Sequence, residues 1–172
     1  MIISLTGFMG VGKSTIAEKL SAHLYCKHID LDSYIEESRG EKIVDIFSSL
    51  GEENFREIEE QALENLLSQN REKVMVLSLG GGALISPKNR ELIKSQTQCI
   101  YLRASIETLT QRLMHSRKSR PLVHKEENHA LSNKIDELYL EREQGYRESA
   151  SIIIDVDNLS LKDVLVKILS II

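Results

Sequence analysis

The sequence predicts an α/β fold in which a parallel sheet lies between two layers of helices. Three observations lead to this prediction. Short apolar segments with strand character alternate along the chain with longer segments of helical periodicity. A glycine-rich phosphate-binding motif joins the first strand to the first helix. The chain has 172 residues, of which 41% are hydrophobic, which is enough for a single domain with a substantial core.

The expected elements follow one another in a regular order. Strands are predicted near residues 1–6, 27–30, 74–79, 98–103 and 151–155. Helices are predicted near residues 13–25, 32–39, 43–48, 52–69, 87–95, 105–114, 130–148 and 160–170. Strands that are separated by helices pair in parallel, and such sheets bind ligands at the carboxyl ends of their strands. Residues 115–128 are polar and lack a clear pattern, and they are interpreted either as a flexible loop or as a mobile lid.

Composition restricts the kinds of partner that we expect. The net charge of −4 argues against general binding of nucleic acid or of membrane surfaces, which needs a basic face. The chain has no apolar run of about 20 residues and no secretory signal, so we expect a cytoplasmic protein. Cys26 and Cys99 are expected to be buried and reduced, and the five histidines, which lack metal-ligand spacing, to lie at the surface or at helix ends.

The phosphate-binding motif occupies residues 7–14, with the sequence Gly-Phe-Met-Gly-Val-Gly-Lys-Ser. Its glycines allow backbone N–H groups to surround a phosphate, because no side chain is in the way. Lys13 can reach the β- and γ-phosphates, and the hydroxyl of Ser14 can bind Mg²⁺. The helix that follows directs the positive end of its dipole at the same anion. The motif therefore predicts a nucleotide site at the end of the first strand.

Two carboxylates, Asp30 and Asp32, stand where the second strand gives way to a helix. Residues i and i+2 of an extended segment point the same way, so both carboxylates are able to face the nucleotide site. One of them can help to hold hydrated Mg²⁺, and the other can orient or deprotonate a substrate hydroxyl. Helix capping is the alternative, because Asp32 or Ser33 suits an N-cap and Ser33 with Glu36 has the form of a capping box.

Gly80, Gly81 and Gly82 follow the third strand. They allow the backbone to approach a ligand closely and to donate N–H groups to it, although a tight turn explains them equally well. This strand ends without the aspartate that many proteins with a P-loop use for Mg²⁺, and Ser78 is the polar residue available there.

Three arginines are candidates for binding anions. Arg142 shares a helical face with Ile135, Leu138 and Tyr146, and an arginine on an inward face costs free energy unless it meets an anion. Arg56 has Glu52 and Glu60 at i−4 and i+4, so ordinary surface ion pairs also explain it. Arg120 lies in the possible lid, where it can stabilise a transferring phosphoryl group or be a solvated loop residue.

Taken together, these residues resemble the shikimate kinase family from the P-loop to about Asp157. The motifs that carry the resemblance, in chain order, are residues 7–14, 30–32, 51–56, 80–82, 120–122 and 141–142. The resemblance implies a three-layer α/β/α P-loop kinase fold with a five-stranded parallel sheet in the strand order 2-3-1-4-5. It implies one domain over residues 1–172, with a substrate-binding region near 31–60 and a lid near 113–127. It also implies transfer of the γ-phosphoryl group of ATP to the 3-hydroxyl of shikimate, a step toward chorismate and the aromatic amino acids.

The resemblance also implies a role for each candidate residue. Asp32, Lys13 and Arg120 are the expected catalytic residues, and Asp32 contacts the shikimate hydroxyls as base or orienting group. Arg56 and Arg142 hold the shikimate carboxylate, and Gly81 offers a backbone contact. Mg²⁺ is bound by Ser14 and, through water, by Asp30. The groups expected to bind ATP are Gly10, Val11, Gly12, Lys13, Ser14, Thr15 and Arg120.

Two segments differ from the family pattern, and two other functions remain as alternatives. Gln144-Gly145-Tyr146 stands where the family often has a Pro-Leu-Tyr-like stretch, and residues 155–158 lack the basic residue and proline that some members place against adenine. A kinase of another small polyol acid such as gluconate is one alternative. A nucleotide-binding regulatory module is the other, although the sequence has no [NT]-K-x-D motif and retains both Lys13 and Asp32. The acidic balance favours a monomer.

Overall fold

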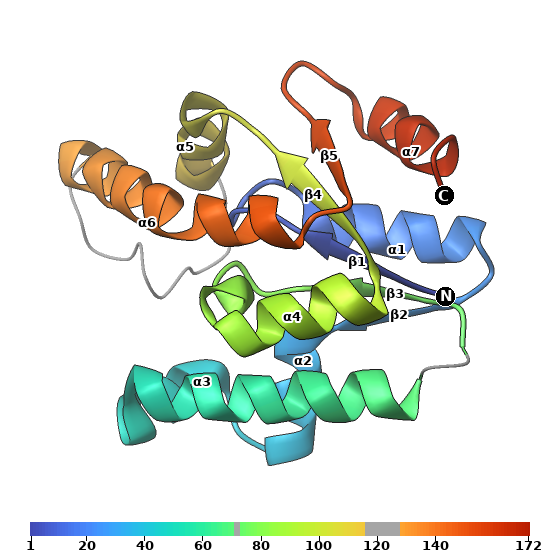
Figure 1. Cartoon of the computed structure of the whole chain (residues 1–172). Coiled ribbons are helices and arrows are strands. Elements are labelled where there is room, and N and C mark those ends of the chain that lie inside the picture. The colour runs from blue at the N-terminus through green and yellow to red at the C-terminus, as the bar shows by residue number, and fades with distance from the viewer. Residues whose placement is uncertain (71–72, 116–127) are drawn as a thin grey trace.

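The computed structural model describes residues 1–70, 73–115 and 128–172, and for residues 128–131 it describes the backbone alone. The described residues form a five-stranded sheet in which all pairings are parallel and the strand order is β2-β3-β1-β4-β5 (Figure 1). The strands are β1 (Ile2–Thr6), β2 (Lys27–Asp30), β3 (Met75–Ser78), β4 (Gln98–Arg103) and β5 (Ile152–Asp155). This is the strand order that the resemblance implied, and the predicted fold class is confirmed.

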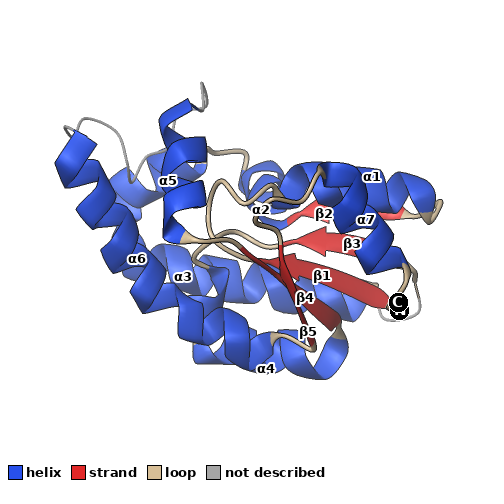
Figure 2. Ribbon diagram, turned by 90° about the horizontal axis from the view of Figure 1, so that it is seen from above, coloured by secondary structure: helices blue, strands red, loops and turns tan. Residues whose placement is uncertain are grey.

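Helices cover both faces of the sheet. Figure 2 shows α1 and α7 on one face and α3, α4 and α6 on the other. The helices are α1 (Lys13–His23), α2 (Leu31–Arg39), α3 (Ile43–Gln69), α4 (Pro87–Gln96), α5 (Ile106–His115), α6 (Asn128–Ser149) and α7 (Leu161–Leu169), with a short 3₁₀ helix, η1, at Ala83–Ile85. The helices predicted at 43–48 and 52–69 are the two parts of α3, which is broken at Gly51, where φ is 80°. None of the described helices is both long and apolar enough to cross a membrane.

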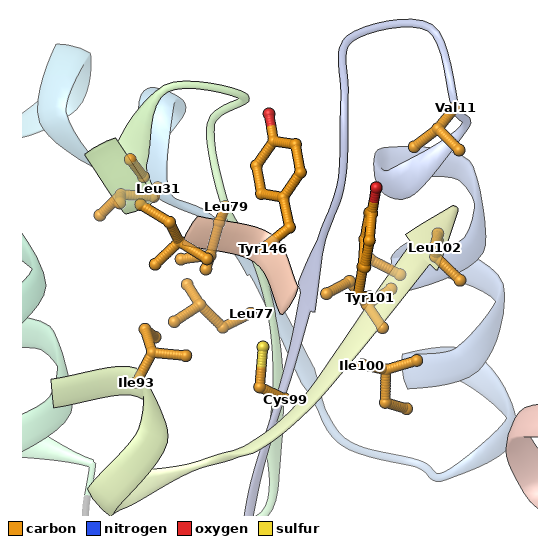
Figure 3. Packing of buried hydrophobic residues seen from close by; sticks show 14 of the residues in the cluster. Val11, Leu31, Leu77, Leu79, Ile93, Cys99, Ile100, Tyr101, Leu102 and Tyr146 are labelled. Carbon is orange, nitrogen blue, oxygen red and sulfur yellow. The ribbon is translucent and has the colours of Figure 1, made fainter. Parts of the chain in front are cut away.

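The strands in the middle of the sheet are buried on both faces, which explains their nearly continuous apolar sequences. Figure 3 shows Leu77 of β3 and Cys99 of β4, the two strands that flank β1, on the same side of the sheet as Ile93 of α4. Cys99 is fully buried as expected, whereas Cys26 is only partly buried, so that part of the prediction was wrong. Because each face of these strands packs against its own layer of helices, a shift of one residue would exchange the two sets of side chains, and the core therefore also fixes the register of the sheet.

Register places Asp30, the last residue of β2, directly beside Ser78, the last residue of β3. The P-loop follows β1, the neighbouring strand, whose Leu5 pairs with Ser78. The carboxyl ends of β2, β3 and β1 therefore bring the acidic pair, the three glycines and the P-loop to one edge of the sheet.

The segment of α6 that departs from the family pattern is helical throughout, because α6 continues to Ser149. Gly145 faces η1 so closely that a Cβ atom there would collide with the carbonyl oxygen of Leu84. This approach brings the next residue, Tyr146, into the core, where it is fully buried. Glycine thus lets α6 pack on η1, and Tyr146 does fill an inward position.

We expect Gly145→Ala to destabilise the protein by about 1–3 kcal/mol, because the backbone of Leu84 must shift to admit the methyl group. The sign is decisive, since Gly→Ala in an unhindered helix interior stabilises by roughly 1 kcal/mol. Urea unfolding measures the effect, with Glu141→Ala at an exposed position of the same helix as the control. A rise in stability would show that α6 does not approach η1 this closely.

Candidate active site

The P-loop connects β1 to the amino terminus of α1, as the motif requires. Gly12 is the N-cap of α1, with φ at 102°, and Lys13 is the first residue of the helix. The ammonium group of Lys13 donates hydrogen bonds to the carbonyl oxygens of Gly7 (2.7 Å) and Phe8 (3.2 Å). Lys13 thus lies across the mouth of the loop, where a bound phosphate would meet its charge.

A cleft of about 680 Å³ opens from the P-loop along the edge of the sheet. Polar and charged groups from α1, β2, α2, α3, α5 and α6 line it, together with apolar side chains of α3. Candidates from the sequence that line it are Gly10, Gly12, Lys13, Ser14, Thr15, Asp30, Asp32, Arg56, Gly80, Gly81, Gly82 and Arg142. Among the predicted site residues, Val11 of the P-loop is buried and does not line the cleft, and Arg120 lies outside the described residues.

Asp30, rather than Asp32 or Ser33, is the N-cap of α2. Its Oδ1 accepts the backbone N–H of Ser33 (3.2 Å), and its Oδ2 accepts the hydroxyl of Ser78 (2.7 Å). Nε2 of His28 lies 2.9 Å from the same hydroxyl. We expected the histidines to lie at the surface or at helix ends, but His28 instead belongs to a hydrogen-bonded network. Burial lowers the pKa of His28, and the negative charges of Asp30 and Glu18 nearby oppose this decrease. The capping prediction was thus wrong in its residue, and Asp30 is held rigidly at the edge of the cleft.

Asp32 lies in the first turn of α2, with its side chain in the cleft. Burial raises its pKa to about 6, the negative charge of Asp30 adds to the rise, and the positive charges of Lys13 and Arg56 oppose it. Its carboxylate touches the backbone of Gly80, where a Cβ atom would lie 2.5 Å from Oδ1. A carboxyl group with its pKa near neutrality and close to a phosphate-binding lysine has the properties of a general base or an orienting group.

The pKa of Asp32 predicts how activity depends on pH. Because the pKa is raised to about 6, the side chain carries its negative charge at pH 7 and becomes protonated as the pH falls through 6. We expect kcat/KM for the phosphoryl acceptor to fall about tenfold between pH 7 and pH 5. Burial also raises the pKa of Glu59, to about 7, so the profile should be repeated with Glu59→Gln. A profile of that variant that is flat down to pH 5 would contradict the role of Asp32.

Two of the three glycines after β3, Gly80 and Gly82, admit charged side chains that any larger residue would exclude. A Cβ atom on Gly82 would lie 2.6 Å from Nη2 of Arg56, and one on Gly80 would meet the carboxylate of Asp32. Gly81 lies between the P-loop and α6, because a Cβ atom on it would lie 3.5 Å from the backbone N of Met9 and 3.7 Å from Nη1 of Arg142. The glycines are therefore more than a tight turn, because they let the acidic and basic groups converge on one wall of the cleft.

Arg56 is held by two carboxylates of its own helix. Nη2 pairs with Glu52 at 3.0 Å, as its spacing predicted, and Nη1 pairs with Glu59 at 2.8 Å. The expected pair with Glu60 is wrong, because Glu60 instead accepts the hydroxyl of Ser86. The side chain of Arg56 is 17% exposed, and its buried Nε lacks a hydrogen-bond partner among the described residues. Arg56 is therefore oriented by its neighbours and retains a group that can donate to a ligand.

Arg142 lies on the inward face of α6, as the helical spacing predicted. Ile135 and Tyr146 of this face are buried, Leu138 is partly buried, and Arg142 itself is only 4% exposed. Its Nε is buried, and no hydrogen-bond acceptor within the described part of the chain reaches it. A buried guanidinium that borders a cleft and is not fully satisfied is a strong indication of an anionic ligand.

Two charged lining residues were missed by the sequence analysis. Glu59 is 1% exposed, pairs with Arg56 and also lines the cleft. It follows Phe55 by four residues and shares the apolar face of α3 with Ala62 and Leu63, so its position on that face was a signal that could have found it. Arg112 of α5 donates from Nη1 to the carbonyl oxygen of Val11 (3.1 Å) and lines the nucleotide end of the cleft, with no pattern in the sequence to mark it.

A P-loop at one end of a cleft, buried arginines at the other and a carboxylate between them define a P-loop kinase that acts on a small anionic molecule. The family model described as "Shikimate kinase" matches residues 9–172. The chain belongs to the shikimate kinase family.

Individual relatives agree with this assignment. The chain is 40% identical to a shikimate kinase of Enterococcus faecalis over 168 residues, which are 97% of this chain and 95% of the relative. The crystal structure of a shikimate kinase from Bacteroides thetaiotaomicron superposes with a TM-score of 0.91 at 29% identity, covering 99% of this chain and 97% of the other. A shikimate kinase from Acinetobacter baumannii, solved in complex with shikimate, gives a TM-score of 0.87 at 35% identity, covering 98% and 90%.

Proposed function

We propose that this chain transfers the γ-phosphoryl group of ATP to the 3-hydroxyl of shikimate, giving shikimate 3-phosphate and ADP. One observation carries the proposal beyond membership of the family. Asp32 lies in the same cleft as the phosphate-binding Lys13 and the buried Arg142, and both ends of a phosphoryl transfer therefore have their binding groups in place. Shikimate is a small polyol with a carboxylate, which matches this set of groups in size and charge.

ATP is the co-substrate, and the groups proposed for its phosphates are Gly10, Val11, Gly12, Lys13, Ser14 and Thr15. The backbone N–H groups of the loop and the amino terminus of α1 surround the β-phosphate. Lys13 is already aligned across the loop by the carbonyl oxygens of Gly7 and Phe8. Arg120 is proposed to reach the phosphates from the lid. Arg120 and most of the expected lid lie outside the described residues.

The residues at the edge of the sheet fit a magnesium ion that arrives with the nucleotide. Ser14 offers a hydroxyl oxygen, and Asp30 has a carboxylate fixed by Ser33 and Ser78 with lone pairs to spare. Mg²⁺ prefers such oxygen ligands and keeps several waters, so it needs no cage of carboxylates. When bound, the ion would neutralise charge on the phosphates.

At the acceptor end, Arg56 and Arg142 are proposed to hold the carboxylate, and Gly81 to offer a backbone contact. A carboxylate accepts paired hydrogen bonds from planar guanidinium groups, and both arginines have a buried Nε that lacks a partner among the described residues. Asp32 then lies at the hydroxyl side of the substrate, where it accepts the proton of the attacking hydroxyl or orients it. Closure of the cleft around both substrates would exclude water and limit wasteful hydrolysis of ATP.

A coupled assay of ADP release tests this proposal. The protein is given Mg-ATP alone, with shikimate, or with gluconate, and we expect ADP release to depend on shikimate. Release that depends on gluconate would favour a kinase of another polyol acid. ATP binding without release under any condition would favour a regulatory module. A monomeric state and a cytoplasmic location stay predictions from the sequence, of which size-exclusion chromatography with light scattering tests the first.

A further inference from the structure

The loop of three glycines is anchored by all three of its carbonyl oxygens. The carbonyl of Gly80 accepts the N–H of Ala83, and the carbonyl of Gly82 accepts the N–H of Ile85, both at 3.1 Å. The carbonyl of Gly81 instead accepts a hydrogen bond from the hydroxyl of Tyr146. Two of the anchors therefore belong to the turn itself, whereas the third comes from a side chain 65 residues away in sequence.

This third anchor decides which way one peptide group faces. The peptide between Gly81 and Gly82 is trans, so its carbonyl and its N–H point in opposite directions. With the carbonyl turned to Tyr146, the N–H of Gly82 points away from Tyr146. A peptide between two glycines has little steric resistance to rotation. Without the anchor, the carbonyl oxygen could turn into the cleft, where it would repel a carboxylate.

Tyr146 is itself held in one position. Its side chain is fully buried, and its ring packs on that of Tyr101, with 5.2 Å between ring centroids. Figure 3 shows the two rings side by side, with both hydroxyl groups directed toward the end of the sheet at which the loop of Val11 lies. Burial raises the pKa of Tyr146, while the positive charge of Arg142 opposes the rise. The phenol is therefore a proton donor throughout the neutral range.

Tyr146 also lies one helical turn after Arg142 on the same face of α6. A Cβ atom on Gly81 would be 3.7 Å from Nη1 of Arg142 and 3.9 Å from the hydroxyl of Tyr146, so the glycine lies beside both side chains. The packing of Gly145 against Leu84 sets the distance between α6 and this loop. One face of α6 thus controls both the guanidinium and the peptide at the acceptor end of the cleft.

We propose that Tyr146 is a positioning residue for the phosphoryl acceptor: its hydroxyl holds the carbonyl of Gly81 out of the cleft, so that the glycine loop presents its N–H groups to the substrate. The proposal rests on the proposed function, in which Gly81 and Arg142 bind shikimate. It assigns no chemical step to Tyr146, which acts through the glycine loop.

The test compares Tyr146→Phe with Tyr101→Phe. Both variants lose one buried hydroxyl from the same pair of packed rings, but the hydroxyl of Tyr101 is bonded to Tyr139, at 3.3 Å, and not to the glycine loop. We expect Tyr146→Phe to raise KM for shikimate by roughly five- to tenfold and to leave KM for ATP within about twofold. Tyr101→Phe should leave both within about twofold. Equal effects of the two variants on KM for shikimate would overturn the proposal.

A measurement on the unsubstituted protein keeps the proposal testable if Tyr146→Phe does not fold. Tyrosine labelled with ¹³C at Cζ shows split resonances in mixed H₂O and D₂O when the hydroxyl proton exchanges slowly, and the chain has five tyrosines to resolve. We expect a split Tyr146 resonance that shifts when shikimate is added. Rapid exchange at Tyr146 would contradict the anchor. If the unsubstituted enzyme shows no turnover that depends on shikimate, the proposed function fails, while this signal still reports whether the anchor exists.

Discussion

Replacing Asp32 with asparagine should lower turnover by roughly 10²- to 10⁴-fold, which is the range typical of losing a general base. Asparagine keeps the size of the side chain that packs against Gly80, but it cannot accept the proton of the attacking hydroxyl. Because Lys13 and the P-loop are unchanged, affinity for ATP should stay within about threefold. Single-turnover kinetics and titration with an ATP analogue measure the two quantities separately.

The matched control for this substitution is Asp45→Asn. Asp45 lies in the first turn of α3, as Asp32 lies in the first turn of α2, but it is exposed. It should retain full activity. Turnover near that of the unsubstituted enzyme in Asp32→Asn would exclude Asp32 as base or orienting group and would direct attention to Asp30.

Replacing Arg142 with alanine should raise KM for shikimate by about 30-fold or more and change KM for ATP by less than about threefold. Truncating one partner of a desolvated charge pair typically costs about 2–5 kcal/mol of binding free energy, because the other charge stays buried without its hydrogen bonds. Here the charge left without them is the carboxylate of the substrate. Arg142→Lys should be intermediate, since lysine keeps the charge but not the planar pair of donors.

Arg147→Ala is the control on the same helix. Arg147 is half exposed and pairs with Glu143 at 2.6 Å, so its loss should leave both KM values unchanged. If Arg142→Ala weakened both substrates equally, Arg142 would not be the carboxylate ligand. Circular dichroism would then show whether α6 had lost its structure.

The fold was predictable from the sequence because its signals are local. Apolar strands alternate with helical segments along the chain. The break of α3 at Gly51 and the position of α7 lie close to where the periodicity places them. The P-loop was predictable for the same reason, since its strand, glycines and lysine are consecutive in the chain.

The partners of the site residues were harder to predict, because they are set by tertiary contacts. Asp30 caps α2 while bonded to Ser78, which is 48 residues further along the chain. Arg56 prefers Glu59 because that position turns toward the cleft, whereas Glu60 turns toward Ser86 at the start of α4. Helical spacing alone treats i+3 and i+4 as equivalent neighbours, and only the packing of α3 on the sheet distinguishes them.

The pairing of Asp30 with Ser78 has a consequence for how the protein acquires activity. β2 is an edge strand, and its only neighbour within the described sheet is β3. A shift of one residue in this pairing would turn Asp30 to the opposite face of the sheet and move Asp32 with the start of α2. A molecule could then have a nearly complete core and still be inactive. The return of activity during refolding therefore reports the docking of one edge strand, and it can lag behind the return of overall secondary structure.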